Sequence, residues 1–546
     1  MPTHWDREVD LLVAGTGAAG LTAAITARDA GADVLVVEST DKWGGTTTLS
    51  GGGLWLPANP LMAGLGAVDS VQNALRYLDE VVGDVGPAGS PARRRAFVEA
   101  VPGFFGLLQR LGVRWVAAKD YPDYYPDRPG GMIGRSVEVE PFDTRKLGEW
   151  FARSRAGEGL PPLPLKTDDV WLLARAWSTP DGFVRGARFV LRSLLGAVRR
   201  RRLYGTGTAL SASLMHIVRT QGTEVLLDAP VVDLVVEDGA VVGALVGAGE
   251  ETMAVRARQG VLLGAGGFAH NAEWRKRHHG IPGYSSAATG DQGTAIALGQ
   301  KIGADVALMD DAWWGAGVPM PDGSTQFVLW ERSFPYSIVV DGTGERYLNE
   351  SESYVDFGHH MLERDEAVRA VPSWLVVERR HRRRYLFTAL AVAGRKLRRA
   401  GTLVEAATVE ELATALGMEP ARLRATVDRF NRFAATGVDE DFGRGRTAYD
   451  RYYGDPTVRP NPNLGPLERG PFQAIELVPG DLGTKGGLLT DEHARVLDTD
   501  GRVIPGLYAA GNTSASVMGR TYPGAGATIA PAAIFGYLGA RHATAR

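Results

Sequence analysis

The sequence predicts an α/β protein with two domains, and three observations support this fold class. The chain has 546 residues, which is too many for one hydrophobic core. Near the N-terminus a short apolar run, residues 9–14, is followed by a glycine turn and a stretch of helical composition. Further apolar runs that enter glycine turns lie at residues 260–268 and 506–515. These runs predict a parallel sheet with strands from both ends of the chain.

Composition narrows the function classes. The apolar fraction of 44% and charged fraction of 23% are typical of a globular protein, and the net charge of −3 gives no reason to expect nucleic acid. The chain has no cysteine, which excludes disulfides, thiolate catalysis and cysteine-bound metal centres. It shows neither a signal-peptide pattern nor 18 consecutive apolar residues. We expect a cytoplasmic protein without a metal site.

The first glycine turn has the pattern of a dinucleotide-binding motif. Gly15 permits the tight turn, Gly17 lets the backbone approach a pyrophosphate, and Gly20 allows close packing of helix and strand. The next apolar run ends at Glu38, whose carboxylate suits the hydroxyls of an adenosine ribose. Since strand, helix and acid all agree, this segment predicts a Rossmann-like domain.

The segment after Glu38 favours FAD over a nicotinamide cofactor. Residues 42–57 read KWGGTTTLSGGGLWLP, a glycine- and hydroxyl-rich stretch where a nicotinamide domain would continue into further strands and helices. The stretch is similar to the flavin-wrapping segment of fumarate-reductase-like flavoproteins. A flexible surface loop is the alternative, against which Trp43 and Trp55 argue.

An FAD domain follows from residues 1–312 and 483–546, with an inserted α+β catalytic domain at residues 313–482. Residues 228–246 read as a β-meander. The predicted FAD contacts lie at the turns and strand ends: Gly15, Gly17, Ala18, Ala19, Gly20, Glu38, Ser39, Gly45, Thr46, Thr47, Ser50, Gly51, Gly52, Val231, Ala265, Gly266, Asp291, Gly511, Asn512, Thr528 and Ile529.

Longer motifs carry a closer resemblance. They are GTGAAG, GGTTTLSGGGLWLP, YPDYYPDRPGG, MDDAWWG, ERYLNESESYVDF, VPGDLGTKGG and GLYAAGNTSASVMGRTYPGAGATIAPA. Through them nearly the whole chain resembles the FAD-dependent 3-ketosteroid Δ1-dehydrogenases, within the fumarate reductase-like flavoproteins. The resemblance implies a flavin domain, a catalytic domain and a 3-ketosteroid substrate between them, used in steroid degradation.

The resemblance also implies four catalytic residues. Tyr522 and the backbone N–H of Gly526 would polarise the C3 carbonyl, and Tyr354 would take the C2 proton. Tyr124 would assist Tyr354, while FAD accepts hydride from C1. Tyr125 is an alternative to Tyr124.

Other interpretations remain open. Tyr336 is an outside candidate for the site. A 3-ketosteroid Δ4-(5α)-dehydrogenase, a fumarate reductase-like enzyme and a steroid carrier without turnover share parts of the pattern. The electron acceptor that reoxidises the flavin is not identified by any motif.

Residues 185–205 alternate apolar side chains with arginine at near-helical spacing. One interpretation is a solvated helix packed on the body of the protein. The other is a basic amphipathic helix that makes peripheral contact with an anionic membrane surface.

Overall fold

The computed structural model describes residues 4–158, 163–247 and 252–545. Its main sheet has eight strands, in the order β20-β21-β11-β1-β2-β8, with β10 paired to β11 and β9 to β10. The pairs along β21-β11-β1-β2-β8 are parallel, whereas β20, β10 and β9 pair antiparallel. The α/β fold class is confirmed. The strands are β1 (Arg7–Ala14), β2 (Val34–Val37), β8 (Glu224–Leu226), β9 (Val231–Glu237), β10 (Ala240–Val246), β11 (Met253–Leu263), β20 (Arg495–Leu497) and β21 (Val503–Ala509).

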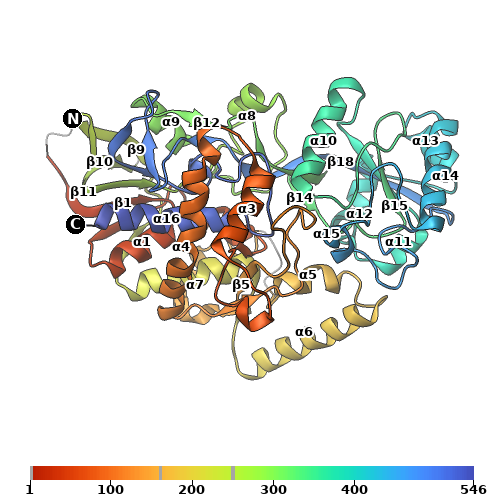
Figure 1. Ribbon diagram of the computed structural model, residues 1–546, viewed down its shortest axis with the longest axis horizontal. Helices are drawn as coiled ribbons and strands as arrows, with labels where there is room; N and C mark the ends of the chain where they lie inside the picture. The colour runs from red at the N-terminus through yellow and green to blue at the C-terminus, as the bar shows by residue number, and fades with distance from the viewer. Residues whose placement is uncertain (1–3, 159–162, 248–251, 546) are drawn as a thin grey trace.

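Successive residues of β1 face two hydrophobic cores. Leu11 and Val13 belong to the core beneath the helices, and Leu12 and Ala14 to the core on the side of β9, β10 and α9 (Thr294–Lys301). Because both faces are covered, the strand is an unbroken apolar run rather than an alternating one. Figure 1 shows the two layers on opposite sides of this sheet.

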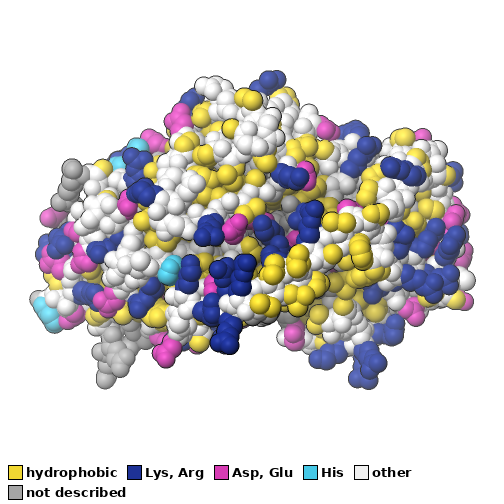
Figure 2. Space-filling view, turned by 90° about the horizontal axis from the view of Figure 1, so that it is seen from below, with side chains coloured by type: hydrophobic (Ala, Val, Ile, Leu, Met, Phe, Trp, Pro, Cys, Tyr) yellow, Lys and Arg dark blue, Asp and Glu magenta, His cyan; other side chains and the backbone are white. Residues whose placement is uncertain are grey.

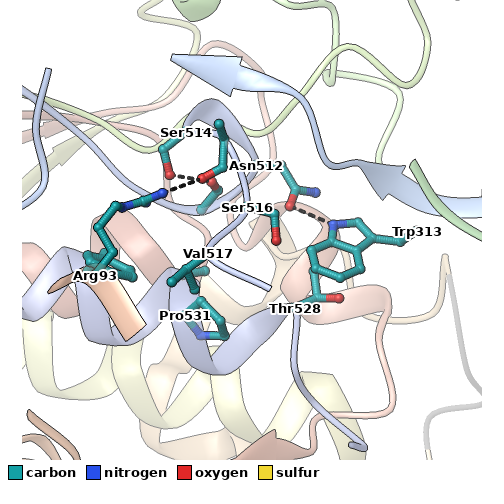
Figure 3. Close-up of a pocket in the computed structure, with 12 residues that line it drawn as sticks. Arg93, Trp313, Asn512, Ser514, Ser516, Val517, Thr528 and Pro531 are labelled. Carbon is teal, nitrogen blue, oxygen red and sulfur yellow. Dashed lines mark hydrogen bonds between the residues drawn. The ribbon is translucent and has the colours of Figure 1, made fainter. Parts of the chain in front are cut away.

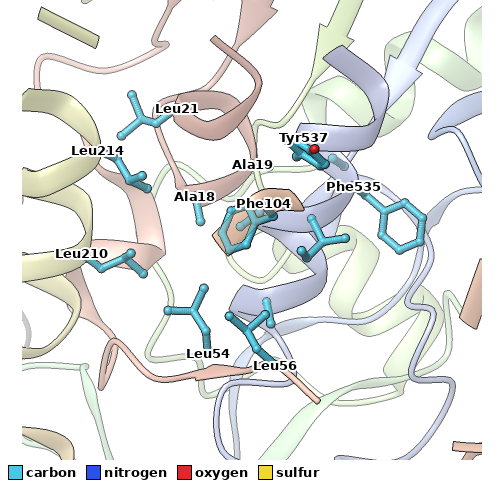
Figure 4. Packing of buried hydrophobic residues seen from close by; sticks show 14 of the residues in the cluster. Ala18, Ala19, Leu21, Leu54, Leu56, Phe104, Leu210, Leu214, Phe535 and Tyr537 are labelled. Atoms are coloured by element: carbon cyan, nitrogen blue, oxygen red, sulfur yellow. The ribbon is translucent and has the colours of Figure 1, made fainter. Parts of the chain in front are cut away.

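Helices α1 (Ala18–Asp29), α7 (Thr206–Thr220) and α16 (Ile529–Thr544) cover one face of the sheet (Figures 1 and 4). Between α1 and α16 the approach is very close, since a Cβ added at Gly536 would lie 2.3 Å from the carbonyl oxygen of Ala19. Outside them, Phe104 of α4 (Pro91–Arg110) packs edge-on against Tyr537 at 6.3 Å. The first and last helices of this domain therefore share one core.

A second, antiparallel sheet has six strands in the order β14-β13-β18-β16-β15, with β17 paired to β18. All of them come from the middle of the chain, and helices α10 to α14 pack around them (Figure 1). The elements are β13 (Ala312–Pro319), β14 (Thr325–Val328), β15 (Ser337–Val340), α10 (Tyr354–Ala367), β16 (Ser373–Val377), α11 (Arg379–Arg384), α12 (Thr388–Ala400), β17 (Leu403–Ala406), α13 (Val409–Ala415), α14 (Pro420–Thr436) and β18 (Phe472–Thr484).

The remaining elements connect these two bodies. They are α2 (Gly45–Leu49), β3 (Leu54–Trp55), α3 (Val71–Val82), β4 (Trp115–Ala117), β5 (Ser136–Val139), β6 (Phe142–Asp143), α5 (Thr167–Leu173), α6 (Pro180–Val198), β7 (Leu203–Tyr204), α8 (Ala272–His279), β12 (Val306–Ala307), α15 (Ala448–Tyr452) and β19 (Gly487–Leu488). Over the described ranges, none of the helices combines the length and the apolar character needed to cross a membrane.

Two local predictions can be compared directly with the structure. Residues 228–246, predicted as a β-meander, form the two-stranded hairpin β9–β10, and β11, which pairs with β10, lies beyond them. The hairpin turn places Asp238 at φ 50° and Gly239 at φ 78°, as a tight turn requires. Residues 42–57 form a packed segment with a short helix, because Trp43 and Trp55 are fully buried. The flexible-loop alternative is wrong.

We expect Gly536→Ala to lower the free energy of unfolding by about 1–3 kcal/mol, because the methyl group forces α1 and α16 apart. Gly394→Ala, in the middle of α12 with no atom within 4 Å of the added Cβ, is the matched control. The control should gain up to about 1 kcal/mol from helix propensity. Denaturant unfolding measures both, and equal effects would contradict the close approach.

Candidate active site

The ends of the parallel strands bring the predicted nucleotide residues together. Gly15 follows β1 with a φ of 101°, and a Cβ there would lie 2.4 Å from the carbonyl oxygen of Gly264 at the end of β11. Glu38 follows β2 and accepts hydrogen bonds from the backbone N–H and the hydroxyl of Thr16, at 3.1 and 2.6 Å. The Ala229 N–H donates to the carbonyl oxygen of Glu38, which places the start of β9 beside this acid. The arrangement has the geometry of an adenosine-binding edge.

Beside it, the N-terminus of α1 faces the glycine-rich segment. The hydroxyl of Thr47 accepts a hydrogen bond from the N–H of Ala18, in the first turn of the helix, at 2.9 Å. A Cβ added at Gly17 would meet only this hydroxyl, at 3.5 Å, and one added at Gly45 would meet only Gly17. The fold itself therefore does not require glycine at position 17. The space that its missing side chain leaves at a helix N-terminus fits a dinucleotide pyrophosphate.

Asp291 is a buried carboxyl group at the same edge. Burial raises its pKa to about 7, while the backbone of Gly267 and the hydroxyl of Thr46 partly oppose that shift. A Cβ added at Gly266 would lie 2.2 Å from the Asp291 carboxylate, so the glycine lets this acid reach the strand end. The predicted residues of both glycine turns thus lie next to each other.

A pocket opens between the end of β21 and α16 (Figure 3). Three predicted FAD residues line it, Gly511, Asn512 and Thr528, and the indole N–H of Trp313 donates to the side-chain oxygen of Asn512 at 3.1 Å. The Arg93 guanidinium also lines the pocket and donates to the carbonyl oxygen of Ala515 at 3.0 Å. The pocket therefore lies where Trp313 meets the end of β21 and the start of α16.

Three tyrosines from distant parts of the chain meet between the two sheets. The ring centroids of Tyr354 and Tyr522 lie 4.7 Å apart, and that of Tyr124 lies 5.5 Å from Tyr354 and 5.1 Å from Tyr522. All three side chains are buried. Tyr354 is the first residue of α10, Tyr124 lies between β4 and β5, and Tyr522 precedes α16. The structure thus assembles all three predicted catalytic tyrosines.

The glycine loop that carries Tyr522 is fixed by its contacts with the N-terminal half of the chain. The carbonyl oxygen of Pro523 accepts hydrogen bonds from the Tyr124 N–H at 2.9 Å and the Tyr77 hydroxyl at 2.7 Å. A Cβ at Gly524 would lie 2.2 Å from the Trp55 ring, and Gly526 has a φ of 95°. These glycines are therefore needed for close packing of the loop.

The electrostatics of the tyrosines favour the neutral phenol. Burial raises the pKa of Tyr354 well above 10, and the nearby Tyr124 and Tyr522 raise it further. Burial also raises the pKa of Tyr522, against hydrogen bonds from Thr528, Tyr354 and the backbone N–H of Gly526. The Gly526 N–H therefore lies beside the Tyr522 hydroxyl. Two hydrogen-bond donors beside each other can polarise a carbonyl oxygen.

The two alternative tyrosines stand outside the cluster of rings, although the side chain of Tyr125 lies beside the backbone of Tyr522. The hydroxyl of Tyr125 donates to Asp356 at 2.9 Å, and the ring of Tyr336 stacks under the Arg380 guanidinium at 4.4 Å. Neither ring packs against the three tyrosines in the contacts found among the described residues. The structure therefore favours Tyr124 over Tyr125.

Sequence reasoning missed part of the aromatic wall. Tyr449 of α15 lies 4.2 Å from Tyr124, and Phe327 of β14 lies 5.3 Å from Tyr354. Trp313 meets Tyr522 edge-on at 5.4 Å. The run YDRYYG at residues 449–454 was a signal for this wall, because it puts three tyrosines on one turn of helix.

Comparison with known proteins identifies the family. The model of the FAD binding domain family matches residues 10–529. The chain is 42% identical to the 3-oxosteroid 1-dehydrogenase of Mycolicibacterium smegmatis, over 98% of this chain and 97% of that protein. This chain belongs to the FAD-dependent 3-ketosteroid Δ1-dehydrogenase family. The predicted family, FAD as cofactor and oxidoreductase class are confirmed.

Two further relatives are informative about the class of substrate. The crystal structure of 3-ketosteroid Δ1-dehydrogenase from Sterolibacterium denitrificans, in complex with 1,4-androstadiene-3,17-dione, superposes with a TM-score of 0.92 at 35% identity, covering 99% of this chain and all of that one. The 4-oxocyclohexanecarboxylate 2-dehydrogenase of Sinomonas cyclohexanicum is also 35% identical, over 97% of this chain and 92% of its own length. Both proteins are named for cyclic ketones.

We expect Gly17→Ala to weaken FAD binding by at least about tenfold, because the methyl group fills the space of the pyrophosphate. The unfolding free energy of the apoprotein should stay within about 0.5 kcal/mol of the original. Exposed Gly64, which has no neighbour within 4 Å of an added Cβ, gives the control Gly64→Ala with unchanged FAD affinity. Flavin retained after gel filtration measures the effect, and full retention by Gly17→Ala would contradict this placement.

Proposed function

We propose that this flavoprotein desaturates the bond between C1 and C2 of a 3-ketosteroid. The observation that carries the proposal is the meeting of Tyr124, Tyr354 and Tyr522 with the Gly526 N–H, next to the pocket that Thr528 and Asn512 line. The names of the relatives support the substrate class.

Tyr522 and Gly526 bind the carbonyl oxygen at C3. Removal of a proton from C2 moves negative charge onto this oxygen, and each donor aimed at it stabilises the transition state by about 3–4 kcal/mol. The side chain and the N–H come from one loop that Pro523 and Gly524 fix in place, so little reorganisation accompanies the reaction.

Tyr354 accepts the proton from C2. Its raised pKa makes the phenolate a strong base but a rare species at neutral pH. Tyr124 holds Tyr354 by edge-on ring packing, and its hydroxyl oxygen lies 3.4 Å from that of Tyr121. Tyr121 in turn contacts the hydroxyl of Tyr453, which gives the proton a row of phenols away from the site.

Bound FAD would supply the acceptor for the hydride that leaves C1. The electron pair of the C2–H bond, left when Tyr354 takes the proton, then forms the new double bond. The turns around Gly17, Glu38 and Gly511 would hold the FAD. Two further points stay predictions. One is that an unidentified electron acceptor reoxidises the flavin, and the other is that residues 185–205 contact a membrane surface.

We also propose the domain division of residues 1–312 and 483–546 around an inserted catalytic domain at residues 313–482. Its support is that the eight-stranded sheet uses strands up to Leu263 and from Arg495, whereas the second sheet uses residues 312–484.

The aromatic wall argues against a site for a small dicarboxylate. Sites for fumarate or a small keto acid need cations that pair with carboxylates, whereas Trp313, Phe327 and Tyr449 surround the tyrosines with apolar rings. A steroid carrier would not need the Gly526 N–H beside the Tyr522 hydroxyl. A Δ4-(5α)-dehydrogenase differs only in the bond oxidised.

Incubation of the holoprotein with androst-4-ene-3,17-dione and an artificial electron acceptor tests the function. We expect a product two hydrogens lighter, with the new double bond between C1 and C2. A 5α-reduced 3-ketone should distinguish Δ1 from Δ4 oxidation by the position of unsaturation. Turnover of 4-oxocyclohexanecarboxylate without turnover of any steroid would overturn the proposed substrate class.

We expect Tyr522→Phe to lower kcat by about 10²–10³, the usual loss for one donor to a developing oxyanion. Tyr336→Phe, which keeps the ring over Arg380, is the control and should turn over like the original protein. Steady-state kinetics with one steroid and one acceptor measure both. Unchanged turnover by Tyr522→Phe would refute the role of this phenol.

The pH dependence follows from the raised pKa of Tyr354. Only the deprotonated phenol is a base, and burial with two neighbouring phenols places its pKa well above 10 in the free protein. Between about pH 7 and about pH 9, kcat/KM should therefore rise about tenfold per pH unit without reaching a plateau. Tyr354→Phe should be inactive throughout. A flat profile in the original protein would mean that another group takes the proton.

A further inference from the structure

Helix α6 carries its large hydrophobic side chains on the face that points to solvent. The exposed fractions of Phe183, Leu191, Leu194 and Val198 are 69%, 57%, 58% and 81%. Their spacing of eight, three and four residues puts them on one side of a helix. Figure 1 shows α6 along the lower edge of the molecule, and Figure 2, seen from below, shows hydrophobic side chains gathered there in one patch.

The opposite face of α6 is bound to the protein through charges and glycines. Arg185 and Arg192 both form ion pairs with Asp169 of α5, whose side chain is fully buried. A Cβ added at Gly182 would lie 2.7 Å from the carbonyl oxygen of Arg175. A surface helix of a globular protein has the reverse arrangement, with apolar side chains inward and charges outward. Helix α6 is therefore built to present its apolar face outward.

Arginines border this apolar face. Residues 182–202 contain seven arginines and no acidic residue. The four at positions 199–202 follow the helix and are exposed, and Figure 2 shows a basic cluster at that end of the patch. Arg188, Arg199 and Arg201 line a groove whose other walls are Leu195 and Leu203. The groove therefore places positively charged side chains next to apolar ones.

We propose that α6 and residues 199–202 dock on the surface of a bilayer that contains anionic phospholipids. The apolar side chains enter the boundary between headgroups and acyl chains, and the arginines contact lipid phosphates. A second copy of the chain is a poorer occupant, because a two-fold contact through α6 would bring the two rows of arginines together.

The docked face lies one helix away from the tyrosines. Trp171 of α5 packs at 4.6 Å against Tyr452, which packs at 4.5 Å against Tyr121. Tyr121 stacks on Tyr124 at 6.3 Å. Collection of a lipophilic substrate from the bilayer rests on the proposed function, whereas docking itself does not.

Flotation of the holoprotein with vesicles tests docking without turnover. Vesicles of phosphatidylcholine with phosphatidylglycerol should carry the protein, and added salt should release part of it. We expect F183S/L191S/L194S to lower the partition coefficient by at least about tenfold. V68S/V392S/V438S removes three exposed apolar side chains elsewhere and should bind like the original protein.

A second variant and its matched control test the role of the arginines that border the apolar face of α6. R188Q/R199Q/R200Q/R201Q should lower binding to phosphatidylglycerol vesicles by at least about tenfold. Its control, R277Q/R383Q/R395Q/R399Q, removes four exposed arginines elsewhere and should leave binding unchanged. Flavin content and thermal unfolding should match the original protein in all four variants.

Three results would overturn the proposal. Retention of the original protein at the bottom of the gradient with phosphatidylcholine–phosphatidylglycerol vesicles refutes docking. Equal flotation of F183S/L191S/L194S and its control refutes the role of α6. A dimer in sedimentation equilibrium that this variant splits, without vesicle binding, identifies a second copy as the occupant. Steroid turnover is measured separately, so a failure of the proposed function is distinguishable from a failure of docking.

Discussion

The carbonyl oxygen of Pro523 accepts two hydrogen bonds, from the Tyr124 N–H and the Tyr77 hydroxyl, and these bonds hold the C-terminal glycine loop against the N-terminal half of the chain. Tyr522 and Gly526 lie on either side of that proline, so their positions depend on the same contact. Tyr124 is fixed by it directly. A buried carbonyl that satisfies two donors is costly to disturb, so this contact fixes Tyr124 and Tyr522 relative to each other.

Glycines serve two distinct purposes in this protein. At Gly15 and Gly526 a left-handed φ and backbone atoms closer than 2.5 Å to an added Cβ make glycine a demand of the fold. At Gly17 and Gly51 the protein alone would accept a side chain, and we propose that the space at these two glycines serves the bound cofactor. The first kind stabilises the loops, and the second shapes the surface presented to the cofactor.

Much of this arrangement could be predicted from the sequence. The strand, turn and acid around Gly15 and Glu38 have local causes, and the tyrosines lie in long motifs. The aromatic wall was missed because Tyr449 and Phe327 reach the site only through the packing of the second sheet. The sequence also left open which face of α6 packs against the protein. Periodicity shows that a helix has an apolar and a polar face, but it does not show which of them points inward. The buried Asp169 decides that through its pairs with two arginines.

Strand β21 and helix α16 complete a sheet and a core that begin with β1 and α1. During translation, the first five hundred residues must leave the ribosome before these partners exist. Until then, β11 has an unpaired edge and α1 has an uncovered apolar face. Both are surfaces prone to aggregation. The parallel sheet of this chain can therefore close only in the last stage of synthesis, when β21 and α16 have emerged.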